Sequence, residues 1–321
     1  MFGENLTPYP AILLRTVLDE ERMYASMLAR VTYDLVGEAL VPAAEQRFDV
    51  GATPRESPLG NVNPDRPYRK EGVDLFVLGE AHAPQGKPVK RLDLRFAVGS
   101  FEARAVAFGP RVWRKNAAGQ LEPSEPEPFT SMSVGLEMGF GGSYEHDDLV
   151  AAYPLNPKGI GFYVDADAAL GKPLPRLEDP SCLVKAWDDK PDPVGFALCQ
   201  VPDPLRLREA ARVVGDKVEG LGARAYNQAF PKMIAPRVIP GDRVVAEGFS
   251  PDGPISFVVP ETDLVVRLRL GEKIVERVPP IEELGLDVAR RQVFIGYRYP
   301  FRYAFVPEQL RTCTLATRRA A

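Results

Sequence analysis

Histidine and cysteine are scarce in this sequence, which narrows the chemistry that it can carry. Its 321 residues include only two histidines, His82 and His146. The three cysteines, Cys182, Cys199 and Cys313, are odd in number and too widely spaced for a zinc motif or a disulfide framework. Because structural zinc sites take four Cys or His ligands, we expect no metal site and no cofactor.

Long apolar runs and a basic net charge are also missing. No run reaches the roughly 18 apolar residues of a membrane helix, so we expect no membrane insertion. Residues 1–4 lack the basic and apolar regions of a secretory signal, which favours a cytoplasmic protein with reduced thiols. The net charge of −4 gives no global field for binding nucleic acid. Only the part from Leu264 onward is basic, with 11 Lys and Arg against 6 Asp and Glu, and it is a possible partner surface.

Proline and glycine, by contrast, are abundant. The chain has 32 prolines and 27 glycines, and an interior proline costs a helix about 3 kcal/mol. Alternating apolar and polar residues instead predict strands. We therefore predict a mainly β fold, antiparallel and β-sandwich-like, with long Pro- and Gly-rich loops. The strands are expected at 23–36, 73–81, 89–98, 101–108, 111–114, 244–249, 255–259, 264–270, 274–278 and 292–299.

One helix is predicted, near residues 204–219. Asp203 is suited to cap it and Pro204 to occupy its first position. Apolar residues then recur at spacings of three and four, and Gly220 would end the helix. We expect residues 1–321 to form a single large β-rich domain, with a loop-rich insert at 154–204.

Residues 137–142 contain the first candidate site. The run Gly139-Phe140-Gly141-Gly142 lacks the spacing of a phosphate-binding loop, so we interpret its glycines as permitting a tight bend. Glu137 follows an apolar pair and has no partner for acid–base chemistry nearby in the sequence. We expect it to pin a loop.

Two alternatives to a purely structural role remain open. Glu145, His146 and Asp148 form an acidic cluster that could serve a metal-dependent hydrolase, although the absence of a second histidine and of a nucleophile elbow nearby favours a solvated loop. Trp113, Trp187 and the tyrosines would suit a carbohydrate-binding β-sandwich.

Cations and aromatics are interleaved at residues 297–303. Such a pattern could stack single-stranded nucleic acid, but the acidic balance of the chain favours an amphipathic edge strand. An edge strand at 292–303 could accept a strand from a partner protein. Arg298, Tyr299 and Arg302 are therefore candidate partner-binding residues.

Nine segments in order then resemble a bacterial family of unknown function, numbered 2169, that is found in type VI secretion gene clusters. They are Gly79–Gly86, Arg111–Arg114, Pro123–Met132, Gly139–Gly142, Asn156–Phe162, Leu174–Pro180, Trp187–Phe196, Tyr226–Pro231 and Ser250–Pro254. The resemblance covers about residues 25–300. Met138 departs from it, because the family often has Arg there, and the stretch after Phe196 is shorter than in the family.

The resemblance implies a non-enzymatic adaptor or chaperone. Members are thought to load an effector toxin onto the secretion spike, the valine-glycine-repeat protein with its PAAR-type tip. The expected partners are thus an effector toxin and a spike or tip protein, no catalytic residue carries over, and the oligomeric state is left open. The family-motif or partner-binding candidates within these segments are Trp113, Arg114, Glu137, Gly139, Gly141, Gly142, Asn156, Gly161 and Trp187.

Overall fold

Three antiparallel-rich sheets form most of the molecule. The computed structural model describes residues 2–17, 22–47, 70–146, 149–198, 211–214, 217–304, 306 and 309–318. The fold is mainly β, as predicted. The largest sheet has seven strands, with the order β19-β5-β24-β25-β3-β2 and with β4 paired to β3. Its strands are β2 (Ala11–Val17), β3 (Arg22–Val36), β4 (Ala39–Pro42), β5 (Val73–Leu78), β19 (Ile234–Ala235), β24 (Ile281–Asp287) and β25 (Gln292–Ala304).

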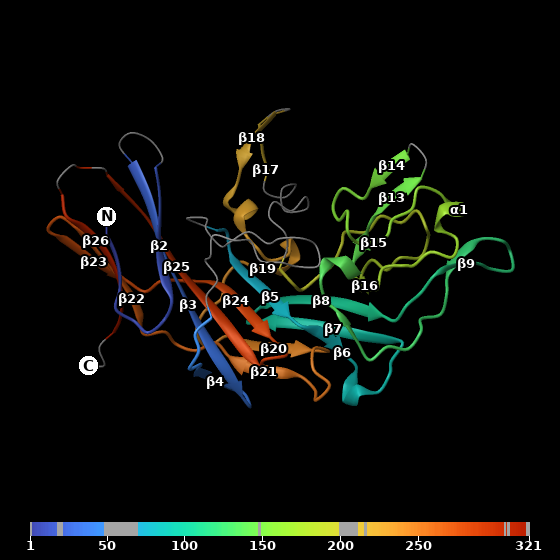
Figure 1. Ribbon diagram of the computed structural model, residues 1–321, viewed down its shortest axis with the longest axis horizontal. Helices are drawn as coiled ribbons and strands as arrows, with labels where there is room; N and C mark the ends of the chain where they lie inside the picture. The colour runs from blue at the N-terminus through green and yellow to red at the C-terminus, as the bar shows by residue number, and fades with distance from the viewer. Residues whose placement is uncertain are drawn as a thin grey trace.

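Two smaller sheets pack against this large sheet, one toward each end (Figure 1). The five-stranded sheet, in the order β16-β8-β7-β20-β21, consists of β7 (Arg91–Val98), β8 (Phe101–Phe108), β16 (Leu177–Glu178), β20 (Arg243–Glu247) and β21 (Ile255–Val258). The four-stranded sheet, in the order β1-β26-β22-β23, consists of β1 (Phe2–Asn5), β22 (Leu264–Leu270), β23 (Lys273–Arg277) and β26 (Arg311–Thr317). One hydrophobic core joins all three sheets.

Short elements make up the rest of the described chain. Two-stranded pairs form between β6 (Glu80–His82) and β11 (Ser131–Ser133), β9 (Trp113–Lys115) and β10 (Leu121–Pro123), β12 (Phe140–Gly141) and β15 (Ile160–Gly161), β13 (Ser143–His146) and β14 (Leu149–Ala152), and β17 (Ala211–Val214) and β18 (Lys217–Leu221). The α-helix of the described residues is α1 (Ala166–Ala169), and 3-10 turns occur at Pro84–Gly86, Leu136–Met138, Ala223–Tyr226 and Pro231–Met233. None of these helices has the length and apolar character that crossing a membrane requires.

The predicted helix near 204–219 is wrong over the residues that the structure describes. Residues 211–214 and 217–221 form the antiparallel pair β17–β18, with a register shift between Arg212 and Val213. The valines at 213, 214 and 218 are β-branched and favour strands, and the Gly215-Asp216 sequence between the two runs is a turn signal. Residues 204–210 lie outside the described part of the chain.

Strand β3 is buried on both faces over part of its length. Met27, Val31 and Leu35 enter the core, while Arg30 and Thr32 on the opposite face are buried as well. The segment after β4 covers part of that second face: the Arg47 N–H donates to the Thr32 hydroxyl at 2.9 Å, and the Arg47 guanidinium lies 5.0 Å from the centre of the Phe294 ring. The large sheet is therefore packed on both faces over this stretch.

Strand β25 is not the edge strand that the sequence suggested. It pairs with β3 along its whole length and with β24 over Gln292–Tyr297. The Arg298 N–H donates to the Pro280 carbonyl, and the Arg298 guanidinium is fully buried, with its Nε 2.5 Å from Glu282 Oε2. The expectation of an exposed Arg298 is wrong, because the residues leading into β24 and the carboxylate of the partly buried Glu282 lie where solvent was expected.

Candidate functional site

A cleft is lined by residues of β8, of the segment after β16 and of the segment leading into β19. These three strands lie near the middle of the molecule (Figure 1). The volume of the cleft is about 510 Å³. Four segments that are distant in sequence line it: residues 101–104 of β8, residues 179–180 after β16, residues 194–196, and residues 230–234 leading into β19. Three of these belong to segments of the family resemblance, those that contain Asp179-Pro180, Val194–Phe196 and Phe230-Pro231.

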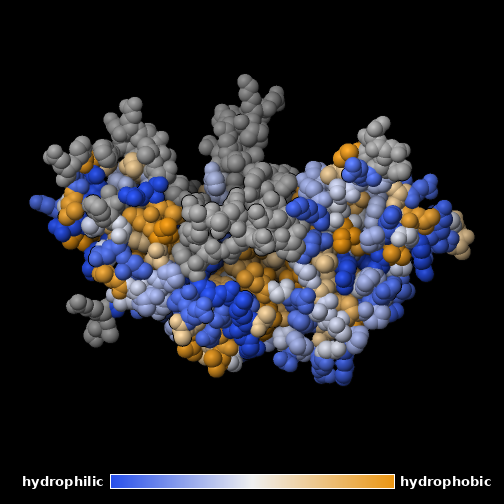
Figure 2. Space-filling view, viewed as in Figure 1, coloured by the Kyte–Doolittle hydropathy of each residue, from blue (hydrophilic) through white to orange (hydrophobic). Residues whose placement is uncertain are grey.

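Apolar side chains form the floor of this cleft. Phe196, Phe230 and Met233 are buried, and Phe196 packs edge-on against Phe249 with ring centroids 5.1 Å apart. The Phe196 carbonyl accepts from the Val77 N–H at 2.9 Å, which ties the floor to β5. On the face seen in Figure 2, hydrophobic residues gather in the middle of the molecule, between more hydrophilic areas on either side.

Charged groups form the rim. Asp179 accepts from the Lys232 ammonium at 2.9 Å and from the Ser181 hydroxyl at 2.6 Å. Burial acts to raise the pKa of Asp179, but these hydrogen bonds outweigh it and lower the pKa to about 2. On β8, hydrogen bonds from Arg104 and Arg95 lower the pKa of Glu102. An apolar floor with a charged rim suits the binding of a protein segment.

A buried carboxylate fixes the cleft segment at 227–231. Asp74 of β5 accepts from the Lys70 ammonium at 2.6 Å, from the Asn227 amide at 2.9 Å and from the backbone N–H groups of Gln228 and Ala229. All of these partners approach a side chain with no exposed surface. The Tyr-Asn-Gln-Ala-Phe-Pro motif at 226–231 is thus anchored by its asparagine and its backbone.

A second buried pair fixes the segment at 174–180. The Arg111 guanidinium contacts Glu178 and the Pro175 carbonyl, and it lies 4.0 Å from the centre of the Phe108 ring. The other Glu178 oxygen accepts from the Val184 N–H at 2.7 Å. Burial raises the pKa of Glu178, although the charge of Arg111 acts in the opposite direction. This pair holds Asp179 at the rim.

The glycine motif and the Asn156 motif form one structural unit beside the cleft. β12 and β15 pair in parallel, Phe140 with Ile160 and Gly141 with Gly161. The buried Asn156 amide donates to the Leu136 carbonyl at 2.7 Å and to the Phe140 carbonyl at 3.1 Å.

Positive φ angles explain the glycines of this unit. They are +151° at Gly141, +121° at Gly142 and +106° at Gly161. The glycines therefore serve the backbone conformation, as expected, but in the short strand β12 and the residue after it and not in a tight bend. Gly139 packs directly against the cleft residue Val194, since a Cβ at Gly139 would lie 2.7 Å from the Val194 carbonyl oxygen.

The other candidates from the sequence lie apart from the cleft. Trp113 is buried in a second hydrophobic cluster, against which the half-buried Trp187 packs. Arg114 is exposed and pairs with Glu122 at 3.0 Å. Glu137 accepts a hydrogen bond from the Ser133 hydroxyl and so closes a local turn.

On β25, the last three candidates do not form one patch. Arg298 is buried, Tyr299 packs against the core and Arg302 is exposed, with its guanidinium 4.7 Å from the centre of the Tyr24 ring. Sequence reasoning did not single out the cleft residues Phe101, Lys232 and Met233, because they are ordinary apolar and basic residues. The order of the three family segments was the one available signal.

The residues of the two alternative functions are also placed. Glu145 is exposed on β13, while Asp148 and the side chain of His146 lie outside the described residues. Within the described part of the chain, no three His, Cys, Asp or Glu side chains gather as a metal site. The Trp113 indole is buried, so it is closed to stacking on a sugar.

Comparison with known proteins identifies a family. No curated protein and no solved structure matches the chain. The family model described as "Uncharacterized protein conserved in bacteria (DUF2169)" matches residues 20–298, which confirms the resemblance drawn from the sequence motifs. The chain belongs to this bacterial family, DUF2169.

Proposed function

We propose that this protein is a non-enzymatic adaptor that helps load an effector toxin onto a type VI secretion spike. The observation that carries the proposal is the convergence of three family segments on one open cleft. Residues from three separate parts of the sequence meet there, around an apolar floor and a charged rim. A binding surface explains this convergence, because buried groups fix two of these segments in place. Asp74 fixes the segment at 227–231, and the Arg111–Glu178 pair fixes the segment at 174–180.

The rigidity of the cleft also supports a binding role. Its walls are strand β8, which pairs with β7, and segments that the buried groups Asp74 and Glu178 hold by hydrogen bonds, so little conformational entropy is lost when a partner docks. The partners of the proposed adaptor are an effector toxin and the spike or its PAAR-type tip. The loading step belongs to the cytoplasm, before secretion.

The proposal is tested by co-expression with the neighbouring spike, tip and toxin genes. The variant Ala103→Trp places a large side chain at the half-buried Ala103 position on the cleft wall. We expect recovery of the toxin or the tip on the tagged protein to fall at least about tenfold. The matched control is Ala118→Trp in the exposed turn between β9 and β10, which should recover both partners as wild type does.

Thermal unfolding separates loss of binding from loss of folding in these variants. If wild-type protein recovers neither toxin nor tip, the adaptor function is wrong. If Ala103→Trp recovers them as well as wild type, the partner does not use the cleft.

A further inference from the structure

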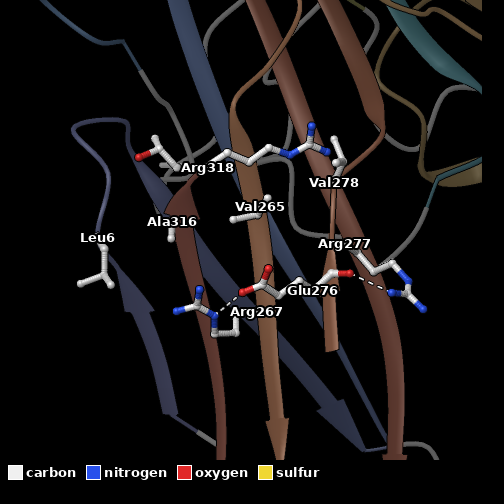
Figure 3. A pocket seen from close by; sticks show the side chains of 9 residues that line it. Leu6, Val265, Arg267, Glu276, Arg277, Val278, Ala316 and Arg318 are labelled. Atoms are coloured by element: carbon white, nitrogen blue, oxygen red, sulfur yellow. Dashed lines mark hydrogen bonds and ion pairs between the residues drawn. The ribbon is translucent and has the colours of Figure 1, made fainter. Parts of the chain in front are cut away.

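A second surface lies at the end of the molecule opposite α1, on the outer face of the four-stranded sheet. It is a groove of about 890 Å³. Figure 3 shows its apolar residues in a row across the sheet: Leu6 beyond β1, Ala316 on β26, Val265 on β22 and Val278 just after β23. Leu6 and Val278 are large apolar side chains that are 60% and 41% exposed.

The charges that line this groove are predominantly positive. Three arginines, Arg267, Arg277 and Arg318, are present with one carboxylate, Glu276. Arg267 and Glu276 pair at 2.6 Å and cancel each other. Arg277 donates to the backbone carbonyl of Glu276 at 2.8 Å, and neither it nor Arg318 pairs with a carboxylate of the described residues. The Arg318 side chain extends across the top of the groove toward Val278 (Figure 3).

Strand β23 borders the groove and is the last strand of its sheet. Among the described residues, β22 is its strand partner, and its other side is open. The two-residue turn Gly271-Glu272 makes Leu270 and Lys273 the hydrogen-bonded closing pair. Because such pairs alternate, the N–H groups of Ile274 and Glu276 point away from β22. The side chain of Ile274 is 57% exposed beside them.

We propose that β23 accepts an extended, acidic segment of a partner protein as an additional strand. The backbone of that segment pairs with the open side of β23, and its apolar side chains pack on Ile274 and Val278. Its alternate carboxylates project to the other face of β23, where they meet Lys273 and Arg277. This assignment rests on the adaptor function, because it specifies the chemistry of a partner and a docking site separate from the cleft.

Charge argues against a second copy of this chain as the occupant. An antiparallel self-pairing centred on Val275 would place Lys273 opposite Arg277 in both halves of the pair. Like charges directly opposite each other destabilise a sheet. An acidic strand instead supplies the opposite charge at both positions.

The test measures binding of a synthetic strand to the purified full chain by fluorescence anisotropy. The probe is a fluorescein-labelled peptide of about ten residues with alternating valine and glutamate. We expect it to bind with a Kd below about 100 μM. The comparison peptides are the same length with lysine in place of glutamate, and the acidic peptide with alternate backbone amides methylated. Both should bind at least about tenfold more weakly.

Two variants test the two parts of the contact separately. Lys273→Glu with Arg277→Glu reverses the charges that face the glutamates and should weaken acidic-peptide binding at least about tenfold. Ile274→Pro removes one outward N–H that β22 does not use, and it should weaken binding to a similar extent. Ile274→Ala keeps that N–H and loses only the apolar contact, so it should weaken binding less than Ile274→Pro does. The matched control is Arg114→Glu, which lies at the other end of the molecule and should stay within about threefold of wild type.

Each contrary result overturns the inference. No acidic-peptide binding, equal binding of the lysine peptide, or unchanged binding by the charge-reversed variant would remove the acidic partner. Unchanged binding by Ile274→Pro would remove strand addition, and a sedimentation dimer that Ile274→Pro disrupts would identify a second copy as the occupant. If Ile274→Pro fails to fold, the methylated peptide tests the same hydrogen bonds.

The experiments can contradict this inference and the adaptor function separately. If the charge-reversed chain recovers toxin and tip, the adaptor function is retained and docking at β23 is wrong. If wild-type protein binds the acidic peptide but recovers neither toxin nor tip, docking at β23 is retained and the adaptor function is wrong.

Discussion

Individual residues of the family motifs act mainly as buried anchors. Asn156 holds two carbonyl groups, and Asp74 holds a motif that is more than 150 positions away in the sequence. Sequence reasoning found the role of the glycines, because positive φ has a local signature. It could not find the cleft or Asp74, because their neighbours come together only through tertiary packing.

Gly141 offers the sharpest test of these anchors. A Cβ at Gly141 would lie 2.1 Å from the Asn156 carbonyl oxygen, at a φ of +151°. We expect Gly141→Ala to lower the free energy of unfolding by at least about 3 kcal/mol, measured by urea denaturation. Gly171→Ala is the control, since φ there is +74° with nothing within 4 Å. It should cost about 1 kcal/mol. Equal losses would show that the contact with Asn156 has no effect.

The sequence predicted strands correctly where apolar and polar residues alternate. It predicted them less well where charged side chains are buried in the sheet. β8 and β22 have the predicted bounds. β24 was missed because Glu282, Glu283 and Asp287 interrupt its apolar pattern, yet Glu283 pairs with Arg30 at 2.5 Å in the sheet interior. The central position of β25 results from its pairing with β24 and with the distant strand β3, and a local sequence pattern does not reveal such a pairing.

The sequence analysis treated Arg298 and Arg302 alike, as candidate partner-binding residues. The position of β25 instead predicts different effects on stability for the two arginines. Arg298→Ala leaves Glu282 without its buried partner and should lower the free energy of unfolding by about 3 kcal/mol. Arg302→Ala removes an exposed contact with the Tyr24 ring and should cost less than about 1 kcal/mol. Urea unfolding followed by circular dichroism measures both. Similar small losses would mean that Arg298 is open to solvent.

Among the described residues, buried apolar side chains form two hydrophobic clusters that contact each other. Leu155 packs against both clusters. The Asn156 amide donates both to the Leu136 carbonyl of the first cluster and to the Phe140 carbonyl of the second. We infer from these shared contacts that the clusters unfold together, in keeping with the single domain expected from the sequence.

The two tryptophans make this inference measurable. Trp113 lies in the second cluster and Trp187 packs against it, so tryptophan fluorescence reports on that cluster alone. Circular dichroism reports on all sheets. We expect the two signals to give the same urea midpoint, since a cooperative unit has one transition. An earlier fluorescence transition would instead show that the second cluster opens by itself.

The parallel pairing of β1 with β26 has a consequence for biosynthesis. Phe2 pairs with Thr312 and Asn5 with Leu315, so β1 must wait for a strand that is synthesised about 300 residues later. β3 likewise waits for β25, which forms its longest pairing. Contacts this far apart in the chain close slowly and leave strand edges open in the meantime. Nascent chains that end before residue 292 lack β25, so we expect chaperones to bind them more strongly than they bind the full chain.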